Sequence, residues 1–468
     1  MAKALIGSQL RQLRRQHGHT QAEMARRLDI SPAYVNLLEN NQRALSVQVL
    51  MALTEVYGVD MRDLVSDRDT ARLADLRAAV ADPAFAEDKP DLQELRSVVD
   101  HAPRFADLFL HLYRSHRSAV DHLARMGGTG AEGDLLRTAP EAAIHDFFRD
   151  NRNYFDPLET AAEQTRHQIG GAPDDMYALL KRHLRVQFHV DVTVKSTGEM
   201  PDTLRVFDRA AGRVLLSQSL DHPNRVFQLA HVLALVTAPE LLDRLTEASG
   251  IAAEATRARC RVELANYFAA ALLMPYERFL DLAETTEYDI DRLAAAFGTT
   301  FEQVGHRLTT LQRDGARGVG FFLLRIDRAG NVTKRVNATA FALAEKGGAC
   351  PVWNIHNAFA TPGAILPQLV ELPDGARYFT ISRTSDRPSL GTGAAEARLV
   401  VALGCERSEA HRVGYARALN LDRGGAAARI GINCHLCPRP SCPQRAHQPI
   451  HMELPIDANR RGKTRYES

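Results

Sequence analysis

Apolar residues near the start of the chain recur at the spacing of short α-helices. The first helix has apolar positions three or four residues apart, at Ile6, Leu10 and Leu13. A second begins at Thr20–Glu23, where the Thr-x-x-Glu order forms a capping box. A third begins at Ser31–Pro32, because serine caps a helix and proline suits its first position. Two further helices are expected before residue 66.

The second and third helices, joined by a tight turn, have the pattern of a helix-turn-helix. The third exposes Asn36 and Asn40, and Asn or Gln side chains can pair with adenine in the major groove of DNA. Gln21 opens the second helix, where the positive helix end favours a phosphate. The alternative is a small helical bundle with a polar surface.

The rest of the chain predicts a multidomain α+β protein. Residues 67–170 have helical periodicity and are interpreted as a linker or oligomerisation region. Val186–Val194 alternates like a strand, as do three runs after residue 320. We therefore expect an all-α domain at 1–66, the helical region at 67–170, an α+β core at 171–320 and a C-terminal α+β domain at 321–468.

Composition narrows the class of protein. Charged residues make up 25% and hydrophobic residues 45% of the chain, with a net charge of +1, as in ordinary globular proteins. A nucleic-acid surface must therefore be local, and residues 1–43 hold seven Lys or Arg against three acids. No apolar run approaches the roughly 18 residues of a membrane span, and no signal peptide is evident. These features predict a cytoplasmic protein without a membrane partner.

A helix starting near Asn224 carries part of a metallopeptidase pattern. Zinc peptidases use His-Glu-x-x-His, two imidazoles and a general base on one helix face. Here His231 is followed by Val232 at the base position and by Leu235 at the second ligand position, with Glu263 near a third. One imidazole cannot hold a catalytic zinc, so we expect no enzyme. A lone His231 is then either a core residue or part of an apolar pocket able to hold a small acyl chain.

Three cysteines lie close together near the C-terminus, at Cys434, Cys437 and Cys442. With Cys405 they make four thiolates, and one remote cysteine plus a compact trio suits an iron–sulfur cluster better than zinc. Zinc stays open as an alternative because His435 could be a ligand, as does an incidental thiol cluster or a redox disulfide. The remaining two cysteines, Cys260 and Cys350, are not expected to be ligands.

Three segments carry resemblances to known families. The first is Thr-Gln-Ala-Glu-Met-Ala followed by Ser-Pro-Ala-Tyr-Val-Asn-Leu-Leu-Glu-Asn-Asn-Gln-Arg, which resembles XRE/Cro-type repressors. The second, Ala265–Pro275, resembles the ImmA/IrrE type of metallopeptidase-like domain. The third is the tail Gly-Ile-Asn-Cys-His-Leu-Cys-Pro-Arg-Pro-Ser-Cys-Pro. Together they resemble the short-chain fatty-acyl transcriptional regulators over almost the whole chain.

The resemblance implies a regulator of propionyl-CoA or acetate-type metabolism that binds double-stranded operator DNA as a homodimer or homotetramer. It implies a short-chain acyl-CoA effector and a [4Fe–4S] cluster. The implied DNA contacts are Gln21, Ser31, Tyr34, Asn36, Asn40 and Arg43. For the effector we expect contacts from Phe227, His231, Arg325, Trp353 and Arg383. Alternatives are a regulator whose primary signal is redox or iron and, remotely, a metallopeptidase that cleaves a partner repressor.

Overall fold

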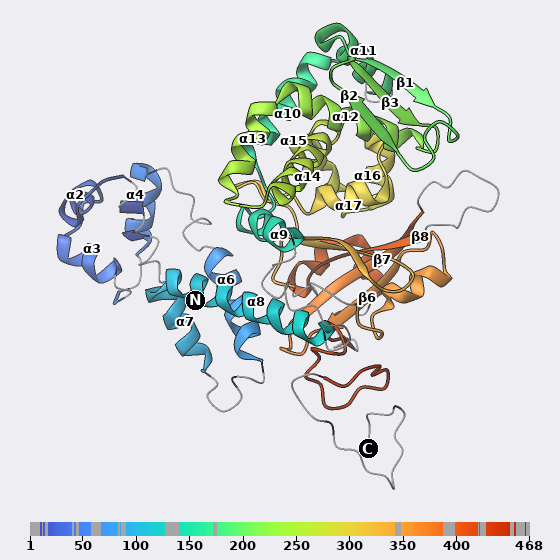
Figure 1. Cartoon of the computed structure of the whole chain (residues 1–468). Coiled ribbons are helices and arrows are strands. Elements are labelled where there is room, and N and C mark those ends of the chain that lie inside the picture. The colour runs from blue at the N-terminus through green and yellow to red at the C-terminus, as the bar shows by residue number, and fades with distance from the viewer. Residues whose placement is uncertain are drawn as a thin grey trace. The chain divides into compact units, whose positions relative to one another are not determined.

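The chain forms two compact units, residues 1–120 and 121–468, in the computed structural model (Figure 1). The structure describes residues 10, 11, 13, 14, 17–39, 42, 43, 46–57, 67–82, 85, 90–126, 140–171, 176–341, 348–386, 398–419, 421, 427–449, 454 and 464. Each unit is described by itself, and the domain limits expected at residues 66, 170 and 320 stay predictions.

The first unit is helical and contains two separate cores. Helices α2 (Gln21–Arg27), α3 (Pro32–Glu39) and α4 (Val47–Tyr57) surround one core that includes Leu10, Met24, Val35 and Leu53. The capping box expected at Thr20 is present, since Thr20 and Glu23 exchange hydrogen bonds. Helices α6 (Asp67–Val80), α7 (Leu92–His101) and α8 (Pro103–Met126) surround the second core.

The second unit begins with helices packed on a small sheet. Its strands, in the order β1-β3-β2, are β1 (Asp191–Lys195), β2 (Arg205–Asp208) and β3 (Arg213–Ser217). The helices are α9 (Pro140–Asp150), α10 (Asp156–Ile169), α11 (Met176–Phe188), α12 (His222–Thr237), α13 (Pro239–Ala248), α14 (Glu254–Leu273), α15 (Tyr276–Thr285), α16 (Ile290–Phe297) and α17 (Phe301–Leu308). Helices α12 and α14 lie at the centre of the core.

The strand expected over Val186–Val194 begins later than predicted. Helix α11 continues to Phe188, and β1 starts at Asp191. Between them His189 adopts a φ of 55°, which turns the chain from helix to strand. Alternation of apolar and polar residues at 186–188 therefore belonged to the last helical turn, where tertiary packing of α11 outweighs local strand preference.

A six-stranded sheet in the order β5-β4-β8-β7-β6-β9 completes the second unit. Its strands are β4 (Phe321–Ile326), β5 (Val332–Asn337), β6 (Leu366–Glu371), β7 (Arg377–Asp386), β8 (Arg398–Glu406) and β9 (Ala428–Arg429). One face shares a core with residues of α15, α16 and α17. The other face packs on an aromatic group that contains Phe322, Phe341, Trp353 and Tyr378.

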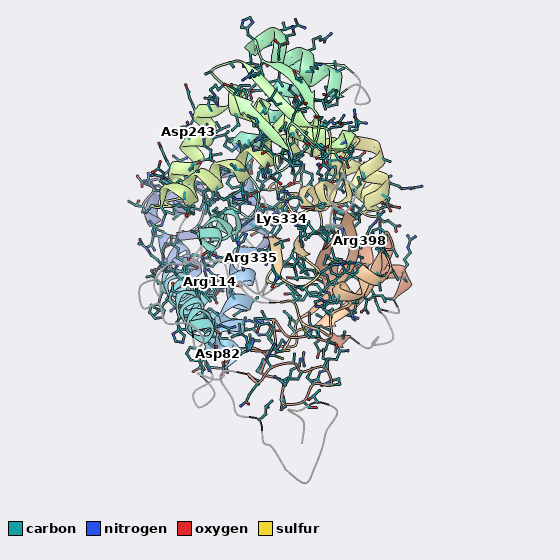
Figure 2. The ribbon with its side chains drawn as sticks, turned by 45° about the vertical axis from the view of Figure 1, so that its right-hand side comes forward. Asp82, Arg114, Asp243, Lys334, Arg335 and Arg398 are labelled. Carbon is teal, nitrogen blue, oxygen red and sulfur yellow. The ribbon has the colours of Figure 1, made fainter. Side chains whose placement is uncertain are left out.

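Long-range polar contacts join the helices of this unit to each other and to its sheet. The Arg307 guanidinium on α17 is fully buried and holds Glu159 of α10 with both nitrogens, at 2.5 and 2.8 Å. Arg335 of β5, labelled in Figure 2, donates from Nε to Nδ1 of His145 on α9 at 2.6 Å. In the described part of the chain no single helix is long and apolar enough to cross a membrane; α12 and α13 pass that test only as a pair bent by 85°.

Candidate functional site

The start of α2 and the outer side of α3 bring the expected DNA-contacting residues together. Gln21 Nε2 donates to Asn36 Oδ1 at 3.5 Å, although the residues are 15 positions apart. Ser31 caps α3, because its Oγ accepts the Tyr34 backbone N–H at 3.1 Å. Ser31 and Asn36 are exposed, and Gln21 and Tyr34 are half-buried. The helix-turn-helix thus offers amides, a hydroxyl and a phenol on one surface.

Arg43 supplies positive charge to the same surface. Its guanidinium carbon lies 5.9 Å from the centre of the Tyr34 ring, within the range of a cation–π contact. This places Arg43 beside the recognition helix, where it can reach a phosphate. The sixth expected contact, Asn40, lies outside the described residues.

A buried carboxylate, Glu39, fixes this surface and was not singled out from the sequence. It is 3% exposed, accepts Arg14 Nε at 2.5 Å and accepts Gln21 Nε2 at 2.9 Å. Burial opposes its ionisation, but hydrogen bonds from Arg14 and Gln21 and the charge of Arg11 outweigh burial and lower the pKa of Glu39. The sequence feature that could have identified Glu39 is its spacing from Val35 and Leu38, since all three lie on the buried face of α3.

The metallopeptidase-like helix, α12, has no metal-binding arrangement around His231. His231 is 3% exposed, and neither ring nitrogen has a hydrogen-bond partner among the described residues. Burial and then the charge of Arg205 lower the pKa of His231 to about 3, and the nearby carbonyl of Val262 opposes that shift only weakly. Val232 is fully buried in the same core. His231 is therefore a neutral core residue.

The two arginines expected to hold CoA phosphates already have carboxylate partners. Arg325 Nη1 donates to Glu302 at 2.7 Å, and Arg383 Nη1 donates to Asp291. Charges around Glu302 are dense, since Lys334, labelled in Figure 2, also lies 3.5 Å from it. A phosphate would have to compete with these carboxylates for either arginine.

The apolar residues expected at the effector lie in separate cores. Phe227 is on α12 and packs at the border of two cores. Trp353 is 3% exposed on the aromatic side of the six-stranded sheet and donates from Nε1 to Thr380 Oγ1 at 3.3 Å. The structure therefore does not bring Phe227 and His231 together with Trp353 around one cavity.

Four cysteines line one pocket at the edge of the six-stranded sheet. The tail provides Cys434, Cys437 and Cys442, as expected from their spacing. The fourth is Cys350, which the sequence analysis set aside. A sequence signal for it exists, because Cys350, Cys437 and Cys442 are each followed directly by proline, whereas Cys405 is followed by Glu406.

The structure places Cys405 away from this pocket. It lies on β8 in a core with Val401 and Leu403, whereas Val400 and Ala402 belong to the core of Cys350. Because side chains of a strand alternate between the faces of a sheet, Cys405 points to the face opposite the one that Cys350 packs against. The expected set of four thiolates therefore changes by one member, with Cys350 in the place of Cys405. Burial raises the pKa of the Cys405 thiol, as for a structural core cysteine.

The chain around the pocket leaves room for the sulfurs and supplies donors to them. Gly431 sits so close to Cys437 that a Cβ added there would lie 2.7 Å from Sγ. Burial raises the pKa of the Cys350 thiol, the amides of Gly431 and Val352 lower it, and the neighbouring Cys434 and Cys437 raise it. These amide N–H groups point to sulfur, an arrangement suited to a thiolate that binds a metal cluster.

Arginines surround the same pocket. Arg445 is 5% exposed, and its Nε and Nη1 have no hydrogen-bond partner among the described residues. Arg439 ties the cysteine loop to the sheet, since Nη2 donates to the Glu371 carbonyl at 2.8 Å and Nε to the Ile430 carbonyl at 3.3 Å. Arg429 also lines the pocket but has a 73% exposed side chain. Four cysteine sulfurs among guanidinium groups fit an anionic iron–sulfur cluster, which would supply a one-electron redox centre.

The spacing of the sulfurs bears on the choice between zinc and a cluster. Among the described residues, no three His, Cys, Asp or Glu side chains are close enough to surround one metal ion. A structural zinc needs four ligands around a single ion, at about 2.3 Å for sulfur. Cysteines of an iron–sulfur cluster bind different iron atoms and so stand further apart. The choice between zinc and an iron–sulfur cluster stays a prediction.

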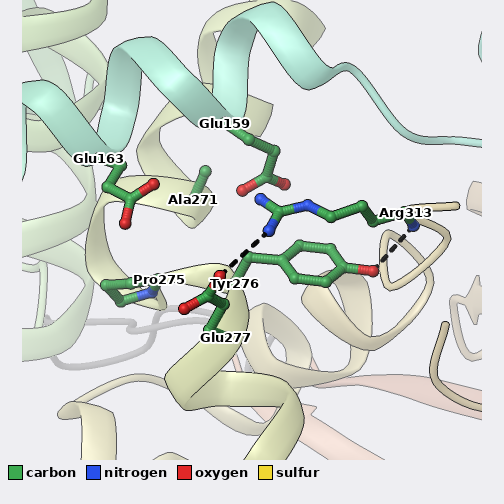
Figure 3. A pocket seen from close by; sticks show the side chains of 7 residues that line it. All are labelled: Glu159, Glu163, Ala271, Pro275, Tyr276, Glu277 and Arg313. Carbon is green, nitrogen blue, oxygen red and sulfur yellow. Dashed lines mark hydrogen bonds and ion pairs between the residues drawn. The ribbon is translucent and has the colours of Figure 1, made fainter. Parts of the chain in front are cut away.

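A second pocket lies between α10, α15 and the segment after α17 (Figure 3). Its lining is polar: Arg313 lies 4.1 Å from the centre of the Tyr276 ring, and Glu159, Glu163 and Glu277 surround it. Arg313 Nε also donates to Tyr154 at 2.9 Å. This lining contains none of the residues expected to contact the effector.

Three family models match separate parts of the chain. They are a helix-turn-helix model at residues 10–64, an IrrE N-terminal-like domain at 186–309 and the C-terminal domain of short-chain fatty acyl coenzyme A regulators at 310–466. The chain is 39% identical to a propionyl-CoA carboxylase regulator of Cereibacter sphaeroides, over 99% of both chains. It is 36% identical to the HTH-type transcriptional regulator RamB of Mycobacterium tuberculosis, over 98% of both chains.

A further relative, the HTH-type transcriptional regulator PrpR of Mycobacterium tuberculosis, is 35% identical over 100% of this chain and 96% of its own. Among solved structures, a Mycobacterium tuberculosis transcriptional regulator superposes with a TM-score of 0.67 at 35% identity and covers 71% of this chain and 100% of its own. The multidomain α+β class and the regulator resemblance predicted from the sequence are confirmed.

Proposed function

We propose, from the premise that this chain belongs to the short-chain fatty acyl coenzyme A regulator family, that a short-chain acyl-CoA controls its binding to operator DNA. The carrying observation is that the likeness to such regulators extends over nearly the whole chain, including the C-terminal domain named for that role. These relatives share the role of a DNA-binding transcriptional regulator. Acyl-CoA would act by binding two states of the protein with different affinity.

The test is a DNA-binding titration at one fixed salt concentration, because affinity for DNA falls steeply with salt. A DNA fragment from upstream of the gene that encodes this protein is titrated with the protein. The titration is done without effector and then with acetyl-, propionyl-, butyryl- or malonyl-CoA, and free CoA is the control. We expect one short-chain acyl-CoA to shift the apparent Kd by about 5- to 150-fold. Equal affinity under all conditions would reject acyl-CoA control while leaving DNA binding intact.

The cysteine pocket supports a second part of the proposal, a [4Fe–4S] cluster held by Cys350, Cys434, Cys437 and Cys442. The support is their convergence on one pocket, the amide donors at Cys350 and the room left by Gly431. Anaerobically purified protein should be brown and contain about four iron atoms and four sulfides per chain. Colourless protein with one bound zinc would reject the cluster and favour the zinc alternative.

The only tryptophan provides an internal probe for this site. Trp353 shares a buried core with Cys350, and its backbone N–H donates to the Cys350 carbonyl at 3.0 Å. A coloured cluster nearby should quench its fluorescence. We expect emission to rise when iron is removed by a chelator under anaerobic conditions and to fall on reconstitution. Emission that does not respond would place the iron elsewhere.

Helix α8 supports the proposal that the protein binds DNA as a homodimer. Phe105, Leu108 and Leu112 lie three and four positions apart and are 65%, 64% and 68% exposed. That spacing forms one seam along a helix, as in paired helices, and helix-turn-helix proteins bind paired half-sites as dimers. Leu108→Glu should lower the mass measured by sedimentation equilibrium and weaken operator binding.

Val186→Glu is the matched control, because Val186 is 62% exposed on another helix, α11. It should leave both mass and affinity unchanged. A Leu108→Glu protein that keeps the wild-type mass would reject α8 as the pairing surface. A wild type that is monomeric at all concentrations would reject the homodimer itself.

A further inference from the structure

Arg445 is the one member of the cysteine pocket whose hydrogen-bonding needs the protein leaves largely unmet. Its side chain is buried, at 5% exposure, yet Nε and Nη1 have no partner among the described residues. Among the described residues only Nη2 has a partner, because it donates to the Arg439 carbonyl. A buried guanidinium with unpaired N–H groups carries a large desolvation cost, so such groups normally face a partner of opposite charge.

The pocket itself offers that partner. Arg445 lines it together with Cys350, Cys434, Cys437 and Cys442, and its backbone N–H donates to the Cys442 carbonyl at 3.2 Å. Arg445 is therefore held in the pocket at two points, by its backbone N–H at Cys442 and by its Nη2 at Arg439. A planar fork with two free donors can bond to sulfur acceptors that carry negative charge.

We propose that Arg445 donates its Nε and Nη1 hydrogens to the sulfur atoms of the iron–sulfur centre and thereby stabilises the reduced form. This inference rests on the proposed cluster. One electron added to the centre increases its negative charge, and a buried cation beside it lowers the energy of that extra charge. Arg445 thus raises the reduction potential of the centre. The electron comes from an external reductant, and no bond of the protein is made or broken.

Two variants test the role of the charge. Arg445→Met removes charge and donors while keeping a long side chain, and Arg445→Lys keeps the charge but loses the planar fork. Arg429→Met is the matched control: it removes the same charge from the same pocket, but Arg429 is 73% exposed and its charge is screened by water.

The measurement is the ratio of reduced to oxidised cluster in anaerobic protein poised with dithionite and redox mediators, read by absorbance and electron paramagnetic resonance. We expect Arg445→Met to lower that ratio about tenfold at the wild-type midpoint, which corresponds to 59 mV for one electron. Arg445→Lys should recover part of the loss, and Arg429→Met should stay within twofold of wild type.

The outcomes separate the inference from the proposal beneath it. Wild-type protein without iron or sulfide would reject the cluster itself. A loaded Arg445→Met protein with the wild-type ratio would overturn the inference about Arg445 while leaving the cluster in place. If Arg445→Met folds without binding iron, the loaded Arg445→Lys and Arg445→Gln variants carry the test: Gln keeps donors without charge, so a ratio equal to that of Lys would contradict a charge effect.

Discussion

The helix of His231 and the pocket of Cys350 are two places where buried polar groups have no hydrogen-bond partner among the described residues, yet only the second brings several such groups together. His231 lies beside a close-packed apolar core, and burial together with the nearby charge of Arg205 keeps the imidazole neutral. Around Cys350 three more thiols, amide donors and Arg445 face a shared space. A site that binds a metal or a cluster therefore needs several polar groups that face one shared space. A single histidine left from a peptidase pattern does not provide this.

The largest expected effect comes from substituting, one at a time, the two buried cysteines that are candidates for the fourth ligand. Cys350→Ser should abolish a stable four-iron cluster, because one of its four anchors is lost. Cys405→Ser should leave iron content unchanged and only reduce stability, since a hydroxyl enters an apolar core. Iron and sulfide analysis of both proteins decides between them. Loss of iron in Cys405→Ser but not in Cys350→Ser would reverse the assignment.

A second prediction concerns whether substitutions can create a metal site around His231. Restoring both peptidase residues with Val232→Glu and Leu235→His should destabilise the protein by on the order of 3–5 kcal/mol, because Val232 is fully buried and the new carboxylate has no partner. Urea unfolding gives the free energy. Stoichiometric zinc binding with unchanged stability would contradict this prediction and show that the core around His231 can hold zinc.

Gly431 tests the importance of room at the cysteine pocket. Gly431→Ala places a methyl group 2.7 Å from Sγ and 2.9 Å from Cβ of Cys437, so the loop must shift. We expect cluster loading under limiting iron to fall severalfold and loss of iron to a chelator to quicken. Gly198→Ala is the matched control, since Gly198, like Gly431, is not at positive φ, and the nearest atom to an added Cβ there, Ser196 Oγ, lies 3.9 Å away. Equal loading of both variants would dismiss the steric argument.

The smallest effect at neutral pH concerns His231, whose contribution to stability appears only in acid. The pKa of this histidine is about 3 in the folded protein and about 6.5 when unfolded. The unfolded chain therefore binds an extra proton below pH 6.5, and stability is lost as pH falls from about 6.5 toward 3, by about 1.4 kcal/mol per pH unit at most. His231→Leu should flatten the curve of unfolding free energy against pH in that window. An unchanged slope would mean that His231 is not buried as a neutral base.

Local patterns in the sequence determined much of the architecture. The capping box at Thr20, the proline after Ser31 and the runs that became β4, β7 and β8 depend on neighbours within a few residues, so they could be predicted. The late start of β1 could not, because α11 gains a last turn from packing that no local pattern encodes.

The candidate sites divide in the same way. The trio Cys434, Cys437 and Cys442 could be predicted because its spacing is local, and the absence of a zinc base beside His231 followed directly from Val232. The carboxylate partners of Arg325 and Arg383 could not be predicted, because Glu302 and Asp291 lie on helices that pack against the sheet only in the folded chain.

The sequence by itself determined the kind of protein and the close spacing of the three cysteines in its tail. Only the tertiary structure decided which remote cysteine joins the trio. Cys405 lies closer along the chain, but the register of β8 turns it to the opposite face of the sheet, and a shift of one residue would have reversed that. Cys350 comes from a loop 84 residues before Cys434, and chain folding, not spacing, brings its sulfur to the pocket.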